Sequence, residues 1–381
     1  MWQTIRGDLR AILPYVPDNS VDACVTDPPY ELGFMGKRWD ATGIAFLVET
    51  WGHVLRVLKP GGHLLAFSGT RTYHRMVVAI EDAGFEIRDQ ADWLYGQGFP
   101  KSLDAAQAID RELGLWSPRG SRVKHAVGQE HLATPKAVGP YAPRSWQATR
   151  WQGWGTAFCP SHEPICVARK PLEGTMGANL LRWGVGALNV DACRIGASKK
   201  VPSSTSSESP TIGWGTGAAG NPGKDPNVGR WPKNLLLDET AAAILEAQSG
   251  ASRFFYVAKA SKSEREGGLD YFPIRTPAQV TNRTEGSIGL ANPRAGMTGS
   301  RGRRNHHPTV KPVALMRYLC RLVTPPGGLI VDPFMGSGTT LVAAIKEGFH
   351  ILGIDLDSDE HGQPLGYTDI ATARCRHAES L

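Results

Sequence analysis

The chain has 381 residues, which is enough for one large domain with an insertion or for two domains. Its apolar content of 41% is ordinary for a globular protein, and no apolar run approaches the length of a membrane-spanning helix. The net charge of +6 permits a polyanionic partner but does not require one. Six sparse cysteines, and a start without an apolar signal segment, favour a reduced, cytoplasmic setting.

The first hundred residues alternate strand-like and helix-like patterns. An apolar run over Val21–Thr26 predicts a short buried strand. Apolar positions near a 3.6-residue period predict a helix over Ile44–Leu58, and a second strand follows at His63–Phe67. A helix over Tyr73–Ala83 precedes another strand that begins at Phe85–Arg88. This alternation predicts an α/β fold with a doubly wound sheet.

The tetrapeptide Asp27-Pro28-Pro29-Tyr30 directly follows the first predicted strand. The carboxyl end of a strand is where open α/β sheets bind ligands. Two consecutive prolines fix φ and remove two backbone donors, which leaves a rigid turn with outward carbonyls. Asp27 and the Pro28 carbonyl can accept two N–H hydrogens while Tyr30 stacks, so the turn suits a flat ligand with an amino group, such as a nucleobase. A plain turn that ends the strand is the alternative.

The middle of the chain, 103–304, has a different composition. A helix is expected over Asp104–Leu113, and the rest is rich in Gly, Pro, Ser and Trp with weak periodicity. Two stretches, about 198–230 and 276–304, are predicted to be flexible loops. Seven tryptophans are expected mostly to pack a small irregular core, with one or two free to contact bases or a dimer interface. They are Trp116, Trp146, Trp151, Trp154, Trp183, Trp214 and Trp231.

Basic residues concentrate around the end of the second loop. Between Arg283 and Arg321, eight Lys or Arg residues accompany a single acid. The group Arg301, Arg303 and Arg304 is predicted to bind nucleic-acid phosphates. A solvated surface run is the alternative.

A metal site is one interpretation of the cysteines in the middle region. Cys159, His162 and Cys166 have a spacing that zinc sites use, and Cys193 could be a fourth ligand. The alternative is that these thiols are small buried apolar groups. We adopt the alternative and expect no metal.

A glycine-rich loop near the C-terminus joins a predicted strand to a predicted helix. The loop Asp332–Thr340 contains Gly336 and Gly338, which permit a tight turn, and the helix start presents free N–H groups. Asp355 follows the next strand, at the spacing of about 20 residues where an acid binds ribose hydroxyls. A phosphate-binding loop would need Lys after Gly338, and a dinucleotide fingerprint would need Gly or Ala where Leu341 stands. A structural turn stays open, but S-adenosylmethionine, with adenine, ribose and a small carboxylate, fits best.

The two motifs together resemble those of the amino-group DNA methyltransferases, which modify adenine N6 or cytosine N4. The catalytic tetrapeptide precedes the cofactor loop, an order similar to the β class, whose S-adenosylmethionine-dependent methyltransferase fold is permuted. Four further segments resemble motifs of this family, over about 1–102 and 305–381 in all. They are Gly7-Asp8 near the cofactor's adenine, Lys59–Phe67 at a helix exit and strand, Gly98–Ser102 beside the target base, and His307–Pro312, which helps to close the cofactor pocket.

The resemblance implies a Rossmann-like sheet made by 1–102 and 305–381, with 103–304 inserted as a large irregular target-recognition region. It implies methyl transfer from S-adenosylmethionine to adenine N6 of double-stranded DNA, with the base flipped out of the duplex. Adenine is expected because Asp27 occupies a position where cytosine enzymes more often have Ser. Cytosine N4 is the alternative, and an RNA methyltransferase or an inactive DNA-binding module is less favoured.

The resemblance also implies a biological setting. The protein is expected to belong to a bacterial or phage-encoded restriction-modification system and to act as a homodimer. We expect it in the cytoplasm, at the nucleoid, and not at a membrane.

In the catalytic turn, the resemblance assigns a role to each residue. Asp27 and the Pro28 carbonyl accept the amino hydrogens, Pro29 stiffens the turn, and Tyr30 stacks on the base. The residues expected to contact DNA are Lys101, Arg301, Arg303 and Arg304.

For the cofactor, the resemblance places Asp8 against adenine and Asp355 at the ribose hydroxyls. Lys311 is expected to pair with the methionine carboxylate, and Asp332 to order the loop. The other cofactor residues implied are Pro333, Phe334, Gly336, Ser337, Gly338, Thr339, Thr340, His307 and Thr309.

Overall fold

The computed structural model describes residues 1–33, 40–96, 98, 102–116, 141–196, 229–258, 262–281, 302–358 and 362–381. Contacts divide the chain into two units. The first unit comprises Met1–Gly96, His162–Ile274 and Arg303–Leu381, and the second comprises Gln97–Ser161 and Arg275–Gly302. More than half of the region that the sequence predicts to be an insertion therefore belongs to the same unit as both motifs.

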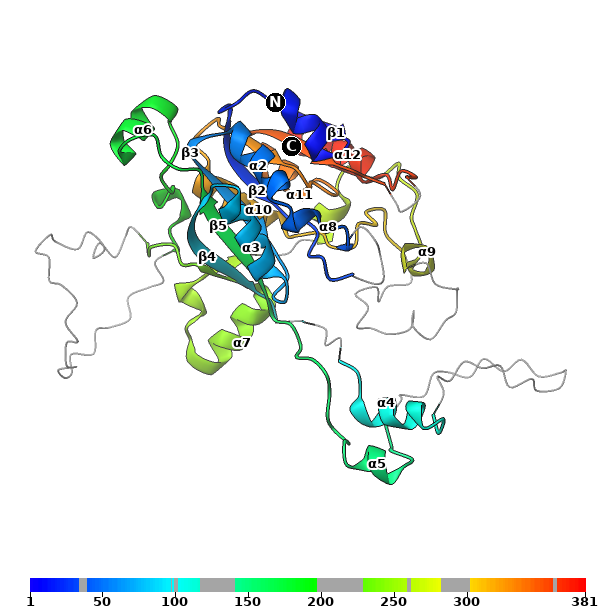
Figure 1. Cartoon of the computed structure of the whole chain (residues 1–381). Coiled ribbons are helices and arrows are strands. Elements are labelled where there is room, and N and C mark those ends of the chain that lie inside the picture. The colour runs from blue at the N-terminus through cyan, green and yellow to red at the C-terminus, as the bar shows by residue number, and fades with distance from the viewer. Residues whose placement is uncertain are drawn as a thin grey trace, which may run out of the picture. The chain divides into compact units, whose positions relative to one another are not determined.

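A nine-stranded sheet organises the first unit (Figure 1). Its strands are β1 (Trp2–Arg6), β2 (Val21–Thr26), β3 (Leu58–Phe67), β4 (Glu86–Leu94), β5 (His162–Arg169), β6 (Leu235–Asp238), β7 (Tyr256–Ala258), β8 (Leu329–Asp332) and β9 (His350–Asp355). Their spatial order is β1-β9-β8-β2-β3-β5-β4-β6-β7. Neighbouring strands are parallel except where β5 lies between β3 and β4, so β5 runs against the other eight described strands.

Helices cover both faces of this sheet. The described helices of the first unit are α1 (Leu9–Ile12), α2 (Val48–Val57), α3 (Tyr73–Asp82), α6 (Met176–Trp183), α7 (Glu239–Ser249), α8 (Lys262–Glu266), α10 (Val313–Val323), α11 (Thr339–Lys346) and α12 (Tyr367–Glu379), with 3₁₀ turns at Leu13–Tyr15, Ile44–Phe46, Asp191–Cys193 and Ser252–Phe254. Leu65 and Phe67 of β3 pack with α10, α11 and α12, whereas Leu64 and Ala66 pack with α1, α2 and α3. The alternation follows from the two-residue period of a strand. No described helix has the length and apolar character needed to cross a membrane.

The strand order reverses between β8 and β2. From β8 the chain passes through α11 to β9 on one side, and from β2 it passes through α2 to β3 on the other. Ligands of open α/β sheets bind outside the carboxyl ends of the strands at such a point. The fold therefore brings the turn after β2 and the glycine-rich loop after β8 to one place.

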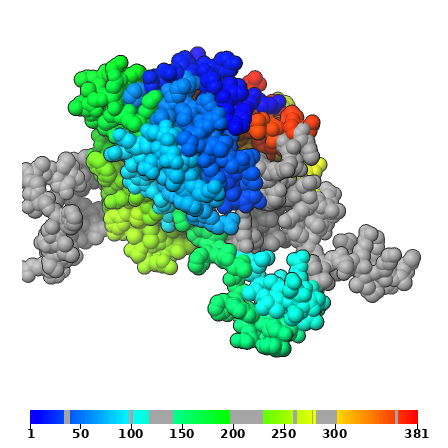
Figure 2. All heavy atoms as spheres, in the orientation of Figure 1, coloured from blue at the N-terminus to red at the C-terminus, as the bar shows by residue number. Residues whose placement is uncertain are grey.

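The N-terminal and C-terminal segments of the first unit complete the same sheet. β1 pairs in parallel with β9, and Trp2 Nε1 donates a 3.0 Å hydrogen bond to Glu379 of α12. Figure 2 shows the dark blue residues of the N-terminus beside the orange and red residues of the C-terminal segment. This arrangement confirms the permuted α/β sheet that the sequence predicts.

The helix predicted over Ile44–Leu58 is divided in the structure. A 3₁₀ turn over Ile44–Phe46 comes first, Leu47 is extended, and α2 begins at Val48. The Glu31 carboxylate accepts hydrogen bonds from the backbone N–H groups of Gly43 and Ala45 and so fixes the turn separately from the helix. The 3.6-residue period continued across this break because both pieces bury apolar side chains on the same face.

The second unit contains α4 (Ala105–Glu112), α5 (Trp146–Thr149) and α9 (Pro277–Thr281). Its polar centre is the buried Asp110, which accepts hydrogen bonds from Tyr141 Oη (2.8 Å), Arg144 N (2.6 Å) and Ser145 Oγ (2.5 Å). The helix α9 occupies part of the second predicted loop, and most of both predicted loops lies outside the described residues.

The prediction that most of these tryptophans pack a core is wrong, because four of the six described ones are exposed. Trp146, Trp151 and Trp154 of the second unit are 68%, 45% and 62% exposed, and Trp231 of the first unit is 60% exposed. Trp151 and Trp154 pack edge to face, with ring centroids 5.2 Å apart. Aromatic composition alone does not distinguish a core from an exposed aromatic surface.

Candidate active site

Four carboxylates follow four neighbouring parallel strands at one edge of the sheet. Asp8 comes after β1, Asp355 ends β9, Asp332 ends β8, and Asp27 comes after β2, in the spatial order of the strands. Parallel strands end at a common edge, so the order of the acids along that edge follows from the topology. The sequence-predicted catalytic turn and cofactor loop thus form one continuous site.

Asp27 lies in a largely enclosed position beside Lys311. Its Oδ2 atom is 2.6 Å from Lys311 Nζ, whereas Oδ1 is buried and has no hydrogen-bond partner. Burial raises the pKa of Asp27 above its ordinary value; Lys311 opposes this shift, and the nearby Glu163 carboxylate adds to it. A buried acceptor without a partner is costly, so Oδ1 is a position where a ligand N–H would be stabilised.

Tyr30 is held at both its backbone and its hydroxyl. Thr72 Oγ1 donates a 2.7 Å hydrogen bond to the Tyr30 carbonyl, and Tyr30 Oη donates to Glu163 Oε2 at 2.8 Å. A Cβ atom at Gly69 would lie 3.3 Å from the ring atom Cδ2, so the glycine leaves space for the ring. Burial and the two adjacent carboxylates raise the pKa of Tyr30 well above its ordinary value, so the phenol stays neutral.

Lys311 directs its ammonium group at the catalytic turn. Besides Asp27, Nζ is 3.1 Å from Tyr30 Oη and 3.2 Å from Glu163 Oε2, and it lies 4.9 Å from the ring centroid of Phe67. Burial lowers the pKa of Lys311, but the two carboxylates raise it more, so the amine remains charged. The side chain is 8% exposed.

The loop after β8 is fixed from its first residue. Asp332 Oδ1 accepts hydrogen bonds from Thr26 Oγ1 (2.7 Å) and from the backbone N–H of Phe334 (3.1 Å). The first contact joins the end of β8 to the end of β2. Burial raises the pKa of Asp332 to about 7, although its hydrogen bonds, including one with Thr340, act in the opposite direction.

Gly336 and Gly338 are required by their conformation and their surroundings. Gly336 has φ +49°, and a Cβ there would lie 2.7 Å from His307 Nε2. Gly338 has φ +78° at the N-cap of α11, where a Cβ would lie 2.7 Å from Cβ of Ala371. Burial, with help from nearby cations, lowers the pKa of His307 to about 3, so a neutral imidazole faces the loop. The neighbouring Thr309 is exposed, and its backbone N–H donates to His307 Nδ1 at 3.4 Å.

The middle of the loop is held by a buried arginine of α12. Arg374 Nη1 donates to the Ser337 carbonyl at 2.6 Å and to Thr339 Oγ1 at 3.2 Å. Asn305 Nδ2 donates to Ser337 Oγ at 3.2 Å. These contacts use the Ser337 and Thr339 side chains inside the protein, so the loop's shape is set before any ligand binds.

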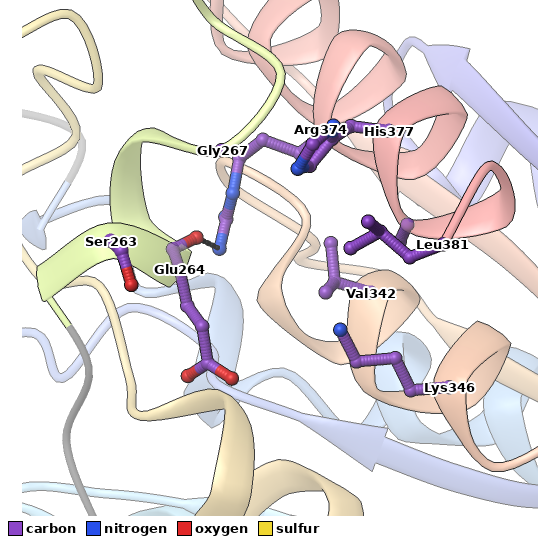
Figure 3. Close-up of a pocket in the computed structure, with 9 residues that line it drawn as sticks. Ser263, Glu264, Gly267, Val342, Lys346, Arg374, His377 and Leu381 are labelled. Atoms are coloured by element: carbon purple, nitrogen blue, oxygen red, sulfur yellow. Dashed lines mark hydrogen bonds between the residues drawn. The ribbon is translucent and has the colours of Figure 1, made fainter.

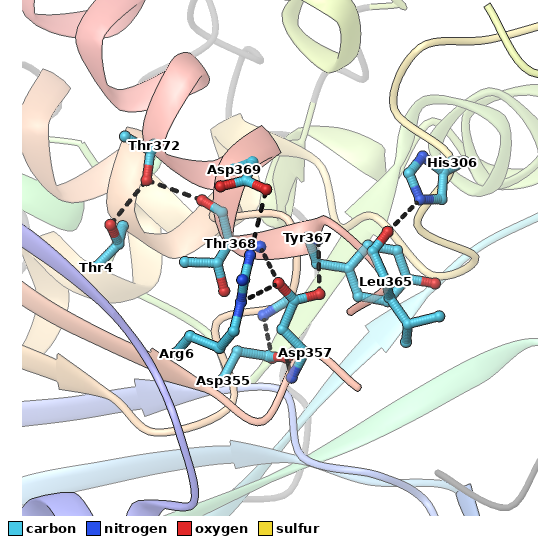
Figure 4. A network of polar contacts seen from close by, with 11 residues as sticks. Thr4, Arg6, His306, Asp355, Asp357, Leu365, Tyr367, Thr368, Asp369 and Thr372 are labelled. Carbon is cyan, nitrogen blue, oxygen red and sulfur yellow. Dashed lines mark hydrogen bonds and ion pairs between the residues drawn. The ribbon is translucent and has the colours of Figure 1, made fainter. Parts of the chain in front are cut away.

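Asp355 is the next acid along the edge. Its Oδ2 accepts from the backbone N–H of Gly336 (2.8 Å) and its Oδ1 from that of Asp357 (2.8 Å). Asp357 is itself buried, accepts from the N–H groups of Tyr367 and Thr368 at the start of α12, and binds Arg6 Nε at 3.0 Å (Figure 4). Burial raises the pKa of Asp355 to about 6.

Asp8 caps the first helix. Its carboxylate accepts from the backbone N–H of Arg10 (2.9 Å) and pairs with the Arg10 guanidinium (2.6 Å). The contact with Arg10 lowers the pKa of Asp8. The preceding Gly7 donates its backbone N–H to the Asp355 carbonyl at 2.9 Å, which ties Asp8 to the edge of the sheet beside Asp355.

A separate pocket of about 160 Å³ lies behind the loop, between α8, α11 and α12 (Figure 3). It is lined by Ser263, Glu264, Gly267, Val342, Lys346, Arg374, His377, Ala378 and Leu381. Figure 3 shows the Arg374 side chain reaching towards Glu264, whose carbonyl accepts from Nη2 at 3.3 Å. The pocket contains no residue of the predicted site, and its volume is below that of ordinary small-molecule sites.

The predicted DNA-contacting residues are only partly described. Lys101 and Arg301 lie outside the described residues. Arg303 is partly buried, and burial lowers its pKa; the backbone N–H of Arg304 donates to Glu266 at 3.0 Å. Among the described residues, no group of three or more His, Cys, Asp or Glu is arranged to hold a metal ion.

Comparison with known families agrees with this geometry. A family model for DNA methylases, N6_N4_Mtase, matches 21–363, which includes the catalytic turn, the glycine-rich loop and Asp355. The chain belongs to this DNA methylase family. The match begins at β2, so Asp8 lies outside it.

Two Type II methyltransferases are similar to this methylase chain. The Type II methyltransferase M.HindIII of Haemophilus influenzae is 23% identical over 312 residues, which cover 81% of this chain and 63% of that protein. M.ScaI of Streptomyces caespitosus is 38% identical over 79 residues, which cover 20% of this chain and 24% of that protein. The chain therefore spans less than two thirds of the length of these relatives.

Solved structures similar to this methylase chain include M1.HpyAVI, with 14% identity, a TM-score of 0.42 and coverage of 98% of both chains. The PvuII DNA methyltransferase, which is described as cytosine-N4-specific, has 14% identity and a TM-score of 0.43, over 99% of this chain and 93% of that one. The assignment to the family rests on the match in sequence.

Several residues that contact the site are absent from the sequence-predicted set, and three charged residues are among them. They are Glu163, Asp357 and Arg374, which contact Tyr30, Asp355 and Ser337 respectively. Asp357 could have been found from its spacing, two residues after the predicted ribose-binding acid. Glu163 and Arg374 carry no local signal, because their partners lie 133 and 37 positions away.

Proposed function

We propose that this chain is a DNA methyltransferase that transfers a methyl group from S-adenosylmethionine to adenine N6 in double-stranded DNA. The observation that carries the proposal is Asp27 Oδ1, a buried acceptor without a partner, at the carboxyl end of β2 and beside the loop after β8. A ligand amino group is the natural donor for such an atom. Cytosine N4 carries an amino group of the same kind and is the alternative target.

The residues along the sheet edge fit the proposed cofactor. S-adenosylmethionine carries donors on its adenine, ribose and ammonium groups, and Asp8, Asp355 and Asp332 offer acceptors in the matching order. Each carboxylate accepts further hydrogen bonds besides those it already makes, since it has about four acceptor positions. Gly336 and Gly338 keep the loop free of side chains where a Cβ would meet His307 or Ala371. When bound, the cofactor supplies an electrophilic methyl group on sulfur.

The residues of this chain position the nucleophile. An exocyclic amino group is a weak nucleophile because its lone pair is delocalised into the ring. Asp27 would accept a hydrogen bond from one amino N–H and the Pro28 carbonyl would accept one from the other, an arrangement that would leave the nitrogen lone pair free to attack a methyl donor. Pro29 stiffens the turn, and the Tyr30 ring stacks on the base. Positioning and local electrostatics supply most of the rate acceleration in such a site.

A base inside a duplex cannot reach this turn, so the target must be flipped out of the stack. Lys101, Arg301, Arg303 and Arg304 are proposed to hold the DNA backbone, since phosphate contacts position a protein on DNA. Adenine is favoured because Asp, and not Ser, occupies position 27, and a homodimer is proposed on the resemblance to the β class.

Nucleoside mass spectrometry tests the proposal. Unmethylated DNA is incubated with the protein and S-adenosylmethionine, digested and compared with DNA treated with Asp27→Ala protein. N6-methyladenine that depends on Asp27 is the expected product. Detection of N4-methylcytosine would change the proposed target base from adenine to cytosine and leave the proposed mechanism unchanged. No modified base in DNA, from protein that binds the cofactor, would contradict the proposal, and RNA would then be tested as substrate.

A further inference from the structure

Lys311, Asp27, Tyr30 and Glu163 form one closed set of contacts. An ammonium group has three N–H donors, and Lys311 has three acceptors within 3.2 Å: Asp27 Oδ2, Tyr30 Oη and Glu163 Oε2. Tyr30 Oη in turn donates to Glu163. Each of the three donors of Lys311 therefore has an acceptor within this set, with none left over for the carboxylate of a bound cofactor.

Glu163 reaches this set because of the direction of one strand. It is the second residue of β5, which runs antiparallel between β3 and β4. The first residues of an antiparallel strand lie at the edge where its parallel neighbours end. The backbone N–H of Ser68, just after β3, donates to the Pro164 carbonyl at 2.9 Å and fixes this end of β5 beside the catalytic turn.

We propose that Glu163 is a positioning residue for methyl transfer, which acts through Lys311 and the Tyr30 hydroxyl to hold Asp27 by Oδ2 and leave Oδ1 for the target amino group. This inference rests on the proposed function. It also assigns Lys311 to the catalytic carboxylate and not to the cofactor.

The charges in this set predict how Asp27 titrates. Two carboxylates face one ammonium group, so Glu163 disfavours the ionised form of Asp27 and Lys311 favours it. Within the set, Tyr30 stays neutral. The other titratable groups near the set are Asp332 at the end of β8 and His307, which is neutral and is influenced by Lys311. Removing Glu163 or Lys311 leaves Asp332 and His307 in place, so the two removals should shift the pKa of Asp27 in opposite directions.

The test measures kcat against pH for the full chain and four variants. Glu163→Gln keeps an acceptor for Tyr30 and removes the charge, so the acid limb of the kcat profile should move to lower pH by at least about half a unit, with a smaller loss of plateau than in Glu163→Ala. Glu163→Ala should show the same shift and a plateau about tenfold lower. Lys311→Met should move the acid limb to higher pH. His162→Gln is the matched control, because His162 begins the same strand and its Nε2 lies 3.9 Å from Asp92.

A second readout needs no turnover. The carboxyl carbon of Asp27, assigned in ¹³C-Asp-labelled protein by comparison with Asp27→Asn, is titrated by NMR in each variant. Opposite shifts in Glu163→Gln and Lys311→Met, with none in His162→Gln, support the proposal. Equal acid limbs and equal Asp27 titrations in wild type and Glu163→Gln would overturn it. Wild-type protein that methylates no base, while Asp27 still shows the two opposite shifts, would contradict the proposed function and support the coupling.

Discussion

Lys311 and Asp27, 284 positions apart in the sequence, form a contact of 2.6 Å between Nζ and Oδ2 at the centre of the site. The two side chains are 8% and 18% exposed. Breaking a buried ion pair by removing one partner is costly, because the other charge is then left uncompensated. The pair therefore stabilises the catalytic turn against the segment before α10.

The first prediction concerns Asp27→Asn. Asn keeps the shape of the side chain but presents a donor where a carboxylate oxygen stood, so methyl transfer should fall by at least about a thousandfold. Cofactor affinity, measured by calorimetry, should change little. The control is Asp22→Asn, a buried acid of β2 that pairs with Lys59 at 2.6 Å, away from the site. Turnover of the folded control should persist; near-normal turnover of Asp27→Asn would contradict the catalytic assignment.

The second prediction separates the ring of Tyr30 from its hydroxyl. Tyr30→Phe keeps the stacking surface and loses the contacts to Lys311 and Glu163, so kcat should fall about tenfold, as expected for a hydrogen bond to a charged group. Tyr30→Ala should lower kcat/KM for DNA by a further factor of about 10 to 100, because base stacking is worth roughly 1–3 kcal/mol. Steady-state kinetics on one DNA substrate measures both. Equal losses in the two variants would argue against a stacking role.

The third prediction concerns the cofactor loop. Gly336→Ala places a Cβ against His307 in a left-handed conformation, so cofactor affinity should fall by more than about tenfold, beyond the roughly 1–2 kcal/mol of backbone strain. Gly348→Ala is the matched control, since Gly348 has φ +77° with open space around its Cβ position. Gly348→Ala should have a lower thermal stability because of the backbone strain, and its cofactor affinity, measured by calorimetry, should be unchanged. Similar losses of cofactor affinity in both variants would contradict the proposal that the loop at Gly336 binds the cofactor.

The fourth prediction concerns pH and His63. Burial, with Arg169 and Arg88 nearby, lowers the pKa of His63 from 6.5 to about 4, and the side chain is 4% exposed. The unfolded chain therefore binds a proton between about pH 4 and 6.5 that the folded chain does not, so this residue makes stability increase with rising pH. In His63→Leu that contribution is absent. Relative to wild type, the free energy of unfolding of the variant should therefore increase by up to about 3 kcal/mol as the pH falls from 7.5 to 4. A pH-independent difference in unfolding free energy would contradict the assignment.

The fifth prediction concerns DNA affinity. Arg301→Gln and Arg303→Gln should each weaken binding to unrelated duplexes by similar factors and reduce the salt dependence of log K by about one. Fluorescence anisotropy over a salt series measures both quantities. Arg376→Gln, at an exposed position of α12, is the control. An unchanged salt slope in both test variants would remove these residues from the proposed DNA contact.

The sequence was sufficient for the parts of the site that are local. Asp27 directly follows a short buried strand and Asp332 ends another, and the glycines at 336 and 338 predict a turn that few other residues could adopt. The position of Asp355 follows from its distance to the loop. In each case one strand and the residues after it contain the whole signal.

Sequence reasoning failed where a contact depends on topology. Nothing near Glu163 indicates that β5 runs antiparallel, yet that direction alone brings it to Tyr30. Lys311 was recognised, but its contact with Glu163 could not be known before β5 was placed. The strands β6 and β7, with four and three residues, are too short to show a period and were missed within a region rich in Gly and Pro.

The adjacency of β2 and β8 has a consequence for how the molecule is made. Asp332 receives its hydrogen bond from Thr26 across 306 positions of sequence, and β9 lies between β8 and β1. When β1, β2 and β3 have been synthesised, the two strands that lie between β1 and β2 in the sheet, β9 and β8, have therefore not yet been made. Pairings of such long range are slow to form and leave strand edges exposed meanwhile. β2 therefore gains its neighbour β8, and β1 gains β9, only after residues 329–355 have been made, so the site between β2 and β8 is among the last features of the molecule to form.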